Sequence, residues 1–395
     1  MPAMCSELNH AEELLNRLVA CPSVNPDAGP SGGDIFGEAR MVTLLAQIVG
    51  GWGGVISRAD LGGGRQNFMA TWPGVDQRRS LLLEAHADTV AVDRMTVPPF
   101  GPMVRDGKLY GRGACDTKGS MAAMLLAIRR VLDGQAKPPV TIHFASTADE
   151  EGGAAGAIRL LADGLRPSAA IVGEPTDLGV ACAHKGACRF RITTHGRTAH
   201  SSVPNQGINA VELMAHIVTA IKHEMAVEMA SQDGGTLGKP TICVTRITGG
   251  QAVNIVPGQC QIEVDRRCLA GENRTGLERQ MRTLLARIIN QCPGAGYELE
   301  VFQWYPALAA DEAGPLASAM VQACENVTGS GRRVVVPYAT NAGFFSEAGI
   351  PCVVFGPGSI KQAHTVDEYV ELQQVVQASR VYEEMIHRFA ACSLS

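Results

Sequence analysis

The sequence has no long run of like charges and no strong surplus of either sign, since its 395 residues carry a formal net charge of −5. Nucleic-acid binding usually shows as a basic surplus, and a membrane-surface or polyanion patch usually shows as a charge run. No apolar stretch reaches the ~20 residues that a membrane helix needs. The sequence therefore indicates a small-molecule partner, with no nucleic acid and no membrane.

Export signals and disulfide patterns are missing as well. Residues 1–9 contain Glu7 and lack the basic region and the long apolar region of a signal peptide. The 12 cysteines never form a C-x-x-C pair, and several lie in apolar runs, where a thiol behaves as a small hydrophobic group. We expect a reduced, cytoplasmic protein; a disulfide framework is the alternative.

The chain is longer than one ordinary core requires, and most of it alternates short apolar runs with helix-like stretches. The apolar runs are 80–85, 140–145, 169–172 and 351–355. Continuous apolar strands separated by helices are typical of a sheet that is covered on both faces. We therefore predict an α/β fold with a mixed, mostly parallel sheet and helices on both faces.

The pattern of apolar and polar residues changes in the middle of the chain. From about Cys188, charged and apolar residues alternate, as in Arg189-Phe190-Arg191-Ile192, which is typical of a half-exposed antiparallel strand. Two long helical stretches follow in the same block. We predict that 187–297 form an inserted α+β two-layer domain, and that 1–186 and 298–395 together form the main domain.

Metal-binding residue types stand at the ends of the predicted strands. His86 and Asp88 are two residues apart and so lie on the same side of their strand. One could bind metal while the other orients it, because a ligating histidine usually has a carboxylate partner. Alone, the pair could equally be a polar strand end. Asp116 lies between glycines before a helix, where an aspartate is often only a turn or N-cap residue.

Further acids and a second histidine follow. The run Asp149-Glu150-Glu151 comes directly after a strand, and adjacent carboxylates repel one another unless a cation or full solvation relieves them. Glu174 ends the next strand, and His364 lies in a loop after the last one. Carboxyl ends of strands in an α/β sheet converge on one crevice. Two histidines and three carboxylates there suit two zinc ions, with one glutamate left over for proton transfer.

In this order the motifs resemble those of the zinc-dependent amidohydrolase and exopeptidase family. That family includes acetylornithine deacetylase, succinyl-diaminopimelate desuccinylase, aminoacylase and glutamate carboxypeptidase. The motifs are H-x-D at 86–88, G-x-G-x-x-D-x-K-G at 111–119, D-E-E at 149–151, G-E-P at 173–175 and the late His364. Details such as Ala183-His184-Lys185-Gly186 and Gly356-Pro357-Gly358-Ser359 look most like acetylornithine deacetylase.

The resemblance implies a set of metal ligands. They are His86, Asp116, Glu151, Glu174 and His364. Asp116 would bridge two Zn²⁺ ions, which Co²⁺ could replace. His86 and Glu174 would complete one site, and Glu151 and His364 the other. The peptide bond after Asp116 is expected to be cis.

The resemblance also implies catalytic roles. Glu150 matches the general acid/base, and Asp88 the residue that orients His86. His200, in the inserted domain, matches a histidine that reaches the partner subunit's active site and stabilises the oxyanion; the alternative is an ordinary loop histidine. A homodimer through residues 187–297, acting as a dimerisation and lid domain, is expected.

Substrate contacts follow from the same resemblance. Asn254 lies in a segment similar to the family's lid. Arg267 would grip the substrate carboxylate, because a guanidinium binds a carboxylate bidentately, or else it lies on the sheet surface. Thr340 and Asn341 match a substrate-binding segment, but relatives commonly have an acid after the threonine. Asn341 therefore leaves a preference for ornithine open.

Together these features predict a metal-dependent hydrolase that cuts the amide bond of a small N-acyl amino acid. N-Acetylornithine or a related N-acetyl amino acid is the expected substrate, which would place the enzyme in amino-acid biosynthesis, arginine biosynthesis in particular. The alternatives are a desuccinylase, an aminoacylase or a dipeptidase on the same site, and a zinc-binding module without activity. A serine hydrolase is not indicated, because no G-x-S-x-G elbow occurs.

Overall fold

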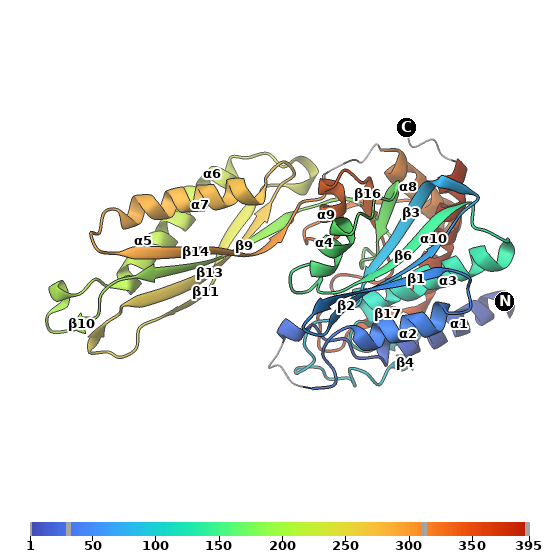
Figure 1. Ribbon diagram of the computed structural model, residues 1–395, viewed down its shortest axis with the longest axis horizontal. Helices are drawn as coiled ribbons and strands as arrows, with labels where there is room; N and C mark the ends of the chain where they lie inside the picture. The colour runs from blue at the N-terminus through green and yellow to red at the C-terminus, as the bar shows by residue number, and fades with distance from the viewer. Residues whose placement is uncertain (1, 29–32, 310, 312–313, 392–395) are drawn as a thin grey trace. The chain divides into compact units, whose positions relative to one another are not determined.

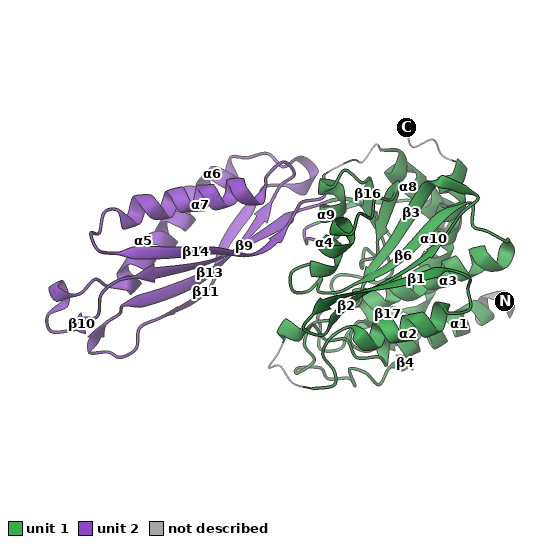
Figure 2. Cartoon of the chain, viewed as in Figure 1, with its two compact units in different colours: residues 1–183, 310–336, 340–395 green, residues 184–309, 337–339 purple. Residues whose placement is uncertain are grey.

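The computed structural model describes residues 2–28, 33–309, 311 and 314–391, with side chains from residue 6 onward. The chain divides into two compact units, which Figure 2 colours separately. Unit 1 comprises Met1–Ala183, Ala310–Val336 and Thr340–Ser395, and unit 2 comprises His184–Ala309 and Pro337–Ala339. Within the described residues, every helix is too short or too polar to span a lipid bilayer.

Unit 1 is built around a mixed sheet with the strand order β1-β2-β6-β3-β7-β16-β8-β15 among the described residues (Figure 1). Its strands are β1 (Val55–Gly62), β2 (Arg65–Trp72), β3 (Asp76–His86), β6 (Val140–Thr147), β7 (Ala169–Val172), β8 (Val180–His184), β15 (Arg333–Val336) and β16 (Cys352–Val354). β3 pairs in parallel with β6 and β7, and β7 with β16. The pairs β1–β2, β2–β6 and β16–β8 are antiparallel. The predicted α/β sheet is confirmed.

Helices cover both faces of this sheet. They are α1 (Pro2–Val19), α2 (Ala39–Val49), α3 (Gly119–Gly134), α4 (Ala155–Ala162), α8 (Pro315–Thr328), α9 (Ala342–Glu347) and α10 (Leu372–Ala391). α3 packs against α10 and α1, and α10 also packs against α8. α4 and α9 contact each other and lie on the opposite side of the sheet (Figure 1).

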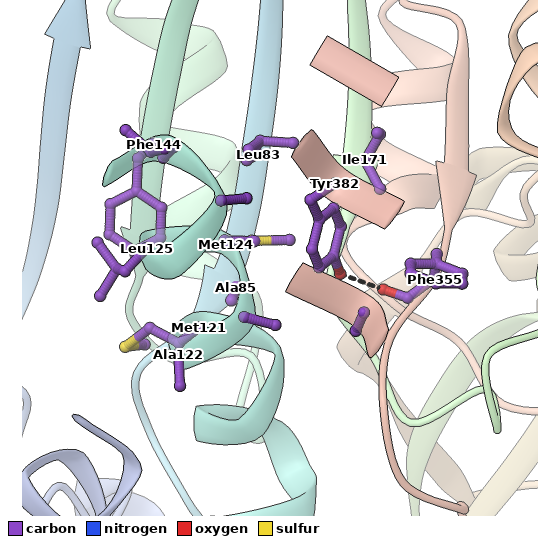
Figure 3. Close-up of a cluster of buried hydrophobic side chains, with 14 of the residues drawn as sticks. Leu83, Ala85, Met121, Ala122, Met124, Leu125, Phe144, Ile171, Phe355 and Tyr382 are labelled. Carbon is purple, nitrogen blue, oxygen red and sulfur yellow. Dashed lines mark hydrogen bonds between the residues drawn. The ribbon is translucent and has the colours of Figure 1, made fainter. Parts of the chain in front are cut away.

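The main core lies between β3, α3 and α10 (Figure 3). Leu83, Met124 and Phe144 are fully buried there, and the Tyr382 hydroxyl donates to the Phe355 carbonyl oxygen at 2.6 Å. Full burial of one large apolar side chain contributes roughly 1.5–3 kcal/mol. Because side chains alternate along a strand, this core fixes β3 with its polar residues, among them His86, on the other face.

A second sheet in unit 1 joins two segments that are far apart in the sequence. It has the order β17-β5-β4, with β4 (Met103–Arg105), β5 (Lys108–Tyr110) and β17 (Tyr369–Glu371). Asp106 and Gly107 turn the chain between β4 and β5 with φ of 52° and 72°, a conformation that suits a tight hairpin. β5 pairs antiparallel with β17, which places the loop after β5 beside the loop before β17.

Unit 2 has one antiparallel sheet with helices on one face. The sheet has the order β11-β13-β9-β14, with β9 (Gly186–His195), β11 (Thr241–Gly249), β13 (Gln259–Cys268) and β14 (Gly296–Tyr305). The helices are α5 (Ala210–Ala220), α6 (Ala226–Ala230) and α7 (Arg274–Ile289). A two-stranded ribbon is formed by β10 (Ala199–His200) and β12 (Ile255–Val256). Short helical turns elsewhere are η1 (Pro26–Ala28), η2 (Ala114–Lys118), η3 (Pro204–Gln206), η4 (Ile221–Met225) and η5 (Gly235–Leu237).

The unit boundaries differ from the predicted limits of 187–297. β14 begins at Gly296 and pairs with β9 as far as Tyr305, so the sheet of unit 2 extends beyond residue 297. The first boundary, between Ala183 and His184, lies within three residues of the predicted one. The second differs because the alternation of apolar and polar residues breaks at Phe302-Gln303, where the register of β14 against β9 shifts, and the pairing itself is not visible in the sequence.

Candidate active site

The five residues predicted to bind metal all lie in unit 1, at the ends of its strands or in adjacent loops. His86 is the last residue of β3, Glu151 follows β6 and Glu174 follows β7. Asp116 lies in η2, just before α3, and His364 lies in the loop before β17. The carboxyl ends of parallel strands meet at one edge of a sheet, so the fold brings these residues to one place.

Asp116 stands between the two histidines. His86 Nε2 lies 3.0 Å from Asp116 Oδ1, and His364 Nε2 lies 3.2 Å from Asp116 Oδ2. Glu151 Oε1 is 2.8 Å from His364 Nε2, and Glu174 Oε1 is 3.9 Å from His86 Nε2. Ligand atoms of His86, Asp116 and Glu151 all lie within 4.8 Å of one another. The peptide bond between Asp116 and Thr117 is cis, as expected.

The charges in this cluster suit divalent cations. Burial raises the pKa of Glu151, and burial together with the Asp116 carboxylate raises the pKa of Glu174 well above its usual value. Although burial opposes it, hydrogen bonding to Asp116 and Glu151 raises the pKa of His364 to about 11. The carboxylates of Asp116, Glu151 and Glu174 are thus crowded together beside His86 and His364. Two divalent cations would neutralise this excess, and a set of two imidazoles and three carboxylates fits zinc.

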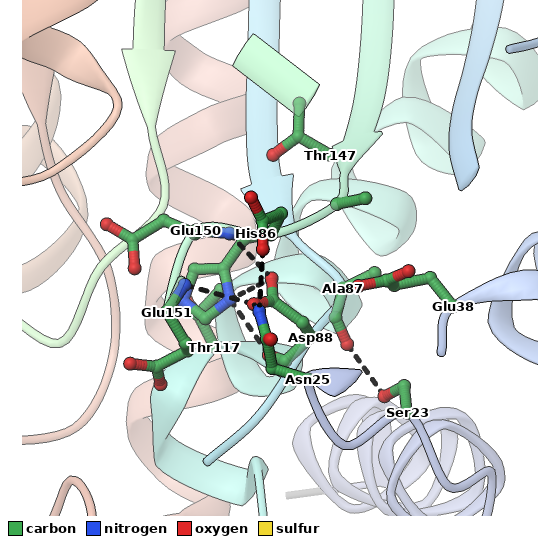
Figure 4. A network of polar contacts seen from close by, with 12 residues as sticks. Ser23, Asn25, Glu38, His86, Ala87, Asp88, Thr117, Thr147, Glu150 and Glu151 are labelled. Atoms are coloured by element: carbon green, nitrogen blue, oxygen red, sulfur yellow. Dashed lines mark hydrogen bonds and ion pairs between the residues drawn. The ribbon is translucent and has the colours of Figure 1, made fainter. Parts of the chain in front are cut away.

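Asp88 and Glu150 lie directly beside the cluster (Figure 4). Asp88 is 0% exposed, and its carboxylate accepts hydrogen bonds from the main-chain N–H groups of Glu150 and Glu151, each at 3.0 Å. His86 Nδ1 lies 2.9 Å from the Asp88 main-chain oxygen, which can only accept, so Nδ1 carries a proton and Nε2, which faces Asp116, is the nitrogen available to a metal ion. Burial, with the carboxylates of Glu151, Asp88 and Asp116 nearby, raises the pKa of Glu150 well above its usual value.

Residues 82–388 match the sequence profile of peptidase family M20/M25/M40. The chain belongs to this family. The matched span is most of the chain and contains all five candidate metal ligands. As a member of peptidase family M20, the protein is a metallohydrolase, and the cluster around Asp116 is its candidate metal centre.

Solved structures of M20 peptidases share the fold. Aminopeptidase PepT from Bacillus cereus is 21% identical with a TM-score of 0.77, over 97% of this chain and 99% of that one. The M20 metallo-carboxypeptidase Sso-CP2 from Sulfolobus solfataricus is 17% identical with a TM-score of 0.79, over 97% and 99%. The Bacillus subtilis YXEP protein, a dinuclear metal-binding peptidase of the family, is 18% identical with a TM-score of 0.69, over 96% and 98%.

Two residues that the sequence analysis did not identify, Asn25 and Arg65, donate hydrogen bonds to acids beside the M20 site. Asn25 Nδ2 donates to Asp88 Oδ2 at 2.7 Å and to Asp149 Oδ1 at 3.1 Å (Figure 4). Arg65 Nε donates to the same Asp149 oxygen at 2.9 Å. Asn25 therefore links the two acids that flank the Glu150 turn. Its only sequence signal is an Asn-Pro pair, which by itself indicates a turn.

Glu368 is a third missed residue. It is 0% exposed, and its carboxylate accepts hydrogen bonds from the loop that carries Asp116. Its position four residues after His364 could have drawn attention to it, because a buried acid near a metal ligand usually has a partner. The partner, Arg112, is 256 residues away in the sequence.

Thr340 and Asn341, expected to contact substrate, lie inside unit 1 and are 0% and 1% exposed. Asn341 Nδ2 donates to Glu84 Oε1 at 3.0 Å and to Thr147 Oγ1 at 3.2 Å. Glu84 is fully buried, and burial raises its pKa. An acid at position 341 would face the Glu84 carboxyl group. The asparagine that departs from the family pattern is therefore explained by Glu84, and its side chain is closed to substrate in this conformation.

His200 and Asn254 lie together in unit 2, and both are exposed. His200 pairs with Ile255 across the β10–β12 ribbon, and Ser201 N donates to the Asn254 carbonyl at 3.0 Å. Ser202 N, which can only donate, lies 3.2 Å from His200 Nδ1. Nδ1 is therefore the acceptor, and the neutral ring carries its proton on Nε2.

Arg267 lies on the four-stranded sheet of unit 2, at the end far from this ribbon. On β13, Gln259 pairs with His195 near the ribbon, whereas Arg267 pairs with Ala187. Eight residues of strand separate these ends, about 26 Å at ~3.3 Å per residue. Arg267 Nε donates to Asp265 Oδ1 at 2.9 Å, and its side chain is 30% exposed. The structure thus groups His200 with Asn254 but separates both from Arg267.

Proposed function

We propose that this M20 enzyme hydrolyses the amide bond of a small N-acyl amino acid, with N-acetylornithine or a related N-acetyl amino acid as substrate. The observation that supports this most strongly is that the four other candidate ligands gather around Asp116, with Glu150 beside them. The reaction class follows from the metal-ligand set and the adjacent acid. The substrate follows from the sequence details that resemble acetylornithine deacetylase.

The candidate ligands divide into two sets that share Asp116. His86 and Glu174 would hold one Zn²⁺, and Glu151 and His364 the other. When bound, two such ions would lower the pKa of a water molecule toward about 7 and polarise the acyl carbonyl group. The contact of His86 Nδ1 with a main-chain oxygen leaves Nε2 as the nitrogen that faces the other candidate ligands, which supports its role as a ligand.

Glu150 would accept a proton from the attacking water and deliver it to the leaving amine. Its main-chain N–H is held by Asp88 Oδ1 at 3.0 Å, so its position relative to His86 and Glu151 is fixed by a buried carboxylate. His200 would donate its Nε2–H to the carbonyl oxygen as that oxygen gains charge. The acceptor contact at His200 Nδ1 supports this, because it leaves the donor on the outer nitrogen.

A homodimer through unit 2 would complete each active site. His200 and Asn254 lie at the β10–β12 ribbon, beside one end of the four-stranded sheet, and Arg267 lies at the other end, so one copy of unit 2 cannot bring all three to a single small substrate. Two copies could: one would supply His200 and Asn254, the other Arg267. Arg267 would hold the substrate carboxylate, and Asp265, at 2.9 Å, orients its guanidinium.

Peptide hydrolysis on the same site is the second candidate function. The fold is shared with an aminopeptidase, a metallo-carboxypeptidase and human carnosine dipeptidase 1, and an amide bond is cut in every case. The buried position of Asn341 bears on this choice. Its side chain is 1% exposed and donates to Glu84, so in this conformation it is closed to an ornithine ammonium, which an acid at this position could contact in relatives.

A substrate panel tests the proposal. Zinc- or cobalt-loaded enzyme would be assayed on N-acetylornithine, N-acetylmethionine, N-succinyl-diaminopimelate and a dipeptide. We expect the highest kcat/KM on an N-acetyl amino acid, no activity after chelation, and a loss of several orders of magnitude in Glu150→Gln with both metals retained. A clear preference for the dipeptide would replace the substrate assignment. Undiminished activity in protein shown to be metal-free would reject the mechanism.

A further inference from the structure

One buried carboxylate ties together the two loops that carry Asp116 and His364. Glu368 Oε1 accepts from the main-chain N–H groups of Cys115 and Asp116, both at 2.9 Å. Glu368 Oε2 accepts from Gly113 N at 3.1 Å and from Arg112 Nη1 at 2.6 Å. All four donors belong to the loop after β5, and the acceptor belongs to the loop before β17.

The fold explains why these groups meet. β5 ends at Tyr110 and β17 begins at Tyr369, and these two residues pair with each other. Glu368 therefore stands opposite the start of the η2 loop, and its carbonyl oxygen accepts from Gly111 N at 3.0 Å. Gly113 has φ of 82°, and a Cβ there would lie 2.8 Å from Thr89 Cγ2. This turn directs several N–H groups at one carboxylate.

The two metal sites depend on this contact to different degrees. His86 is the last residue of β3 and Glu174 comes directly after β7, and these two strands pair inside the main sheet. His364, in contrast, lies in a loop. Its own φ angle is 62°, and its side chain is 48% exposed. The approach of His364 Nε2 to Asp116 Oδ2, 3.2 Å, therefore depends on how the two loops are held together. Glu368 holds them.

We propose that Glu368 is a positioning residue that sets the metal affinity of one site of the pair, the one formed by Asp116, Glu151 and His364. This rests on the ligand assignment in the proposed function and is independent of the substrate. Loss of an interaction that orients metal ligands typically weakens metal binding about 10- to 100-fold. The other site keeps two ligands fixed by the main sheet, so the loss should be selective.

The test is a titration of Zn²⁺ into metal-free protein, followed by calorimetry, with the absorption spectrum of bound Co²⁺ as a second readout. In Glu368→Gln, one equivalent should bind within about threefold of the wild-type affinity, and the other should weaken about 10- to 100-fold. The Co²⁺ spectrum of the weakened site should change. Asp367→Asn is the matched control, because Asp367 is the adjacent acid, is exposed, and loses the same charge; both equivalents should bind as in wild type.

Two further variants guard against misfolding. Glu368→Gln leaves the Arg112 guanidinium buried without its partner, which can destabilise the fold. The double variant Arg112→Gln/Glu368→Gln removes both charges and should still lose the selected site. Arg112→Gln alone keeps the acceptor for the three main-chain N–H groups and should keep both affinities.

The outcomes separate the inference from the proposed function. Two wild-type affinities in Glu368→Gln and in the double variant would overturn the inference, as would equal weakening of both sites. If Glu368→Gln does not fold, the double variant decides by the same criteria. Fewer than two equivalents on the wild-type protein would reject the ligand assignment itself.

Discussion

Replacement of Asp88 by asparagine separates two roles that this residue could have. By family resemblance Asp88 orients His86, but the shortest contact of His86 Nδ1, at 2.9 Å, is to the Asp88 main-chain oxygen, which the substitution keeps. The Asp88 side-chain carboxylate mainly accepts hydrogen bonds from groups other than His86. Its Oδ1 accepts from Glu150 N at 3.0 Å, and its Oδ2 accepts from Glu151 N at 3.0 Å and from Asn25 Nδ2 at 2.7 Å.

The geometry gives the expected size of the effect. Asparagine has the same shape, but one of its two polar atoms donates. The asparagine NH₂ group would face two donors if it lay at the Oδ2 position but only one, Glu150 N, if it lay at the Oδ1 position. We therefore expect the NH₂ group at the Oδ1 position, where the hydrogen bond from Glu150 N is lost. A hydrogen bond to a charged group contributes about 1.5–3 kcal/mol, and a buried N–H left without an acceptor costs about 1–3 kcal/mol. We expect the free energy of unfolding to fall by about 2–4 kcal/mol.

Catalysis should suffer more than metal binding. A displacement of about 1 Å at a catalytic group can lower the rate about 10²-fold, and the disturbed turn carries Glu150. For Asp88→Asn we therefore expect kcat to fall about 10²-fold, with Zn²⁺ affinity within about fivefold of wild type. Steady-state kinetics and a Zn²⁺ titration measure the two quantities, and Asp93→Asn, an exposed acid of the same loop region, is the control. A 10- to 100-fold loss of Zn²⁺ affinity with unchanged kcat per bound metal would show that Asp88 acts through His86 instead.

Two further perturbations test other parts of the molecule. His200→Ala should lower kcat about 10²–10³-fold with metal content intact, because one oxyanion donor is lost. Mixed with Glu150→Gln, it should recover part of the activity after subunit exchange, since one site then has both wild-type residues; exchange without recovery contradicts a role in the partner's site. Glu38 is buried, and burial together with the Asp88 charge raises its pKa from 4.5 to about 8. Between these two pH values only the unfolded chain releases the proton, so wild type should lose stability relative to Glu38→Gln by up to about 1.4 kcal/mol per pH unit as the pH rises. Urea unfolding at pH 5, 6, 7 and 8 measures this, and a difference that does not change with pH would refute the assignment.

The sequence alone determined the four central strands of the main sheet, β6, β3, β7 and β16, and the residues at their carboxyl ends. Apolar runs have a local physical cause, because a strand covered on both faces must be apolar along its length. Once the strands are located, the residues after them follow, and parallel strands bring His86, Glu151 and Glu174 to one edge. The metal-ligand residue types at these positions can therefore be recognised from the order of residues along the chain.

Only the tertiary structure decided how those residues are held. Asn25 reaches Asp88 across 63 positions of sequence, Glu368 reaches Asp116 across 252, and Asn341 reaches Glu84 across 257. A single hydrogen bond between distant segments leaves no periodic trace in either segment. It forms because helix and sheet packing brings the two segments together, as β5 and β17 do around Glu368.

The same reason accounts for the second boundary of unit 2 and for the arrangement of its polar residues. The apolar and polar residues of β14 fall out of alternation at Phe302-Gln303, and its assignment depends on pairing with β9, which lies about a hundred residues earlier. His200 and Arg267 were both identified from local motifs, yet the motifs carry no distance between them. His200 lies on the ribbon beside one end of the four-stranded sheet, and strand register places Arg267 at the other end, because register is set by contacts between strands and not by the residues of one strand.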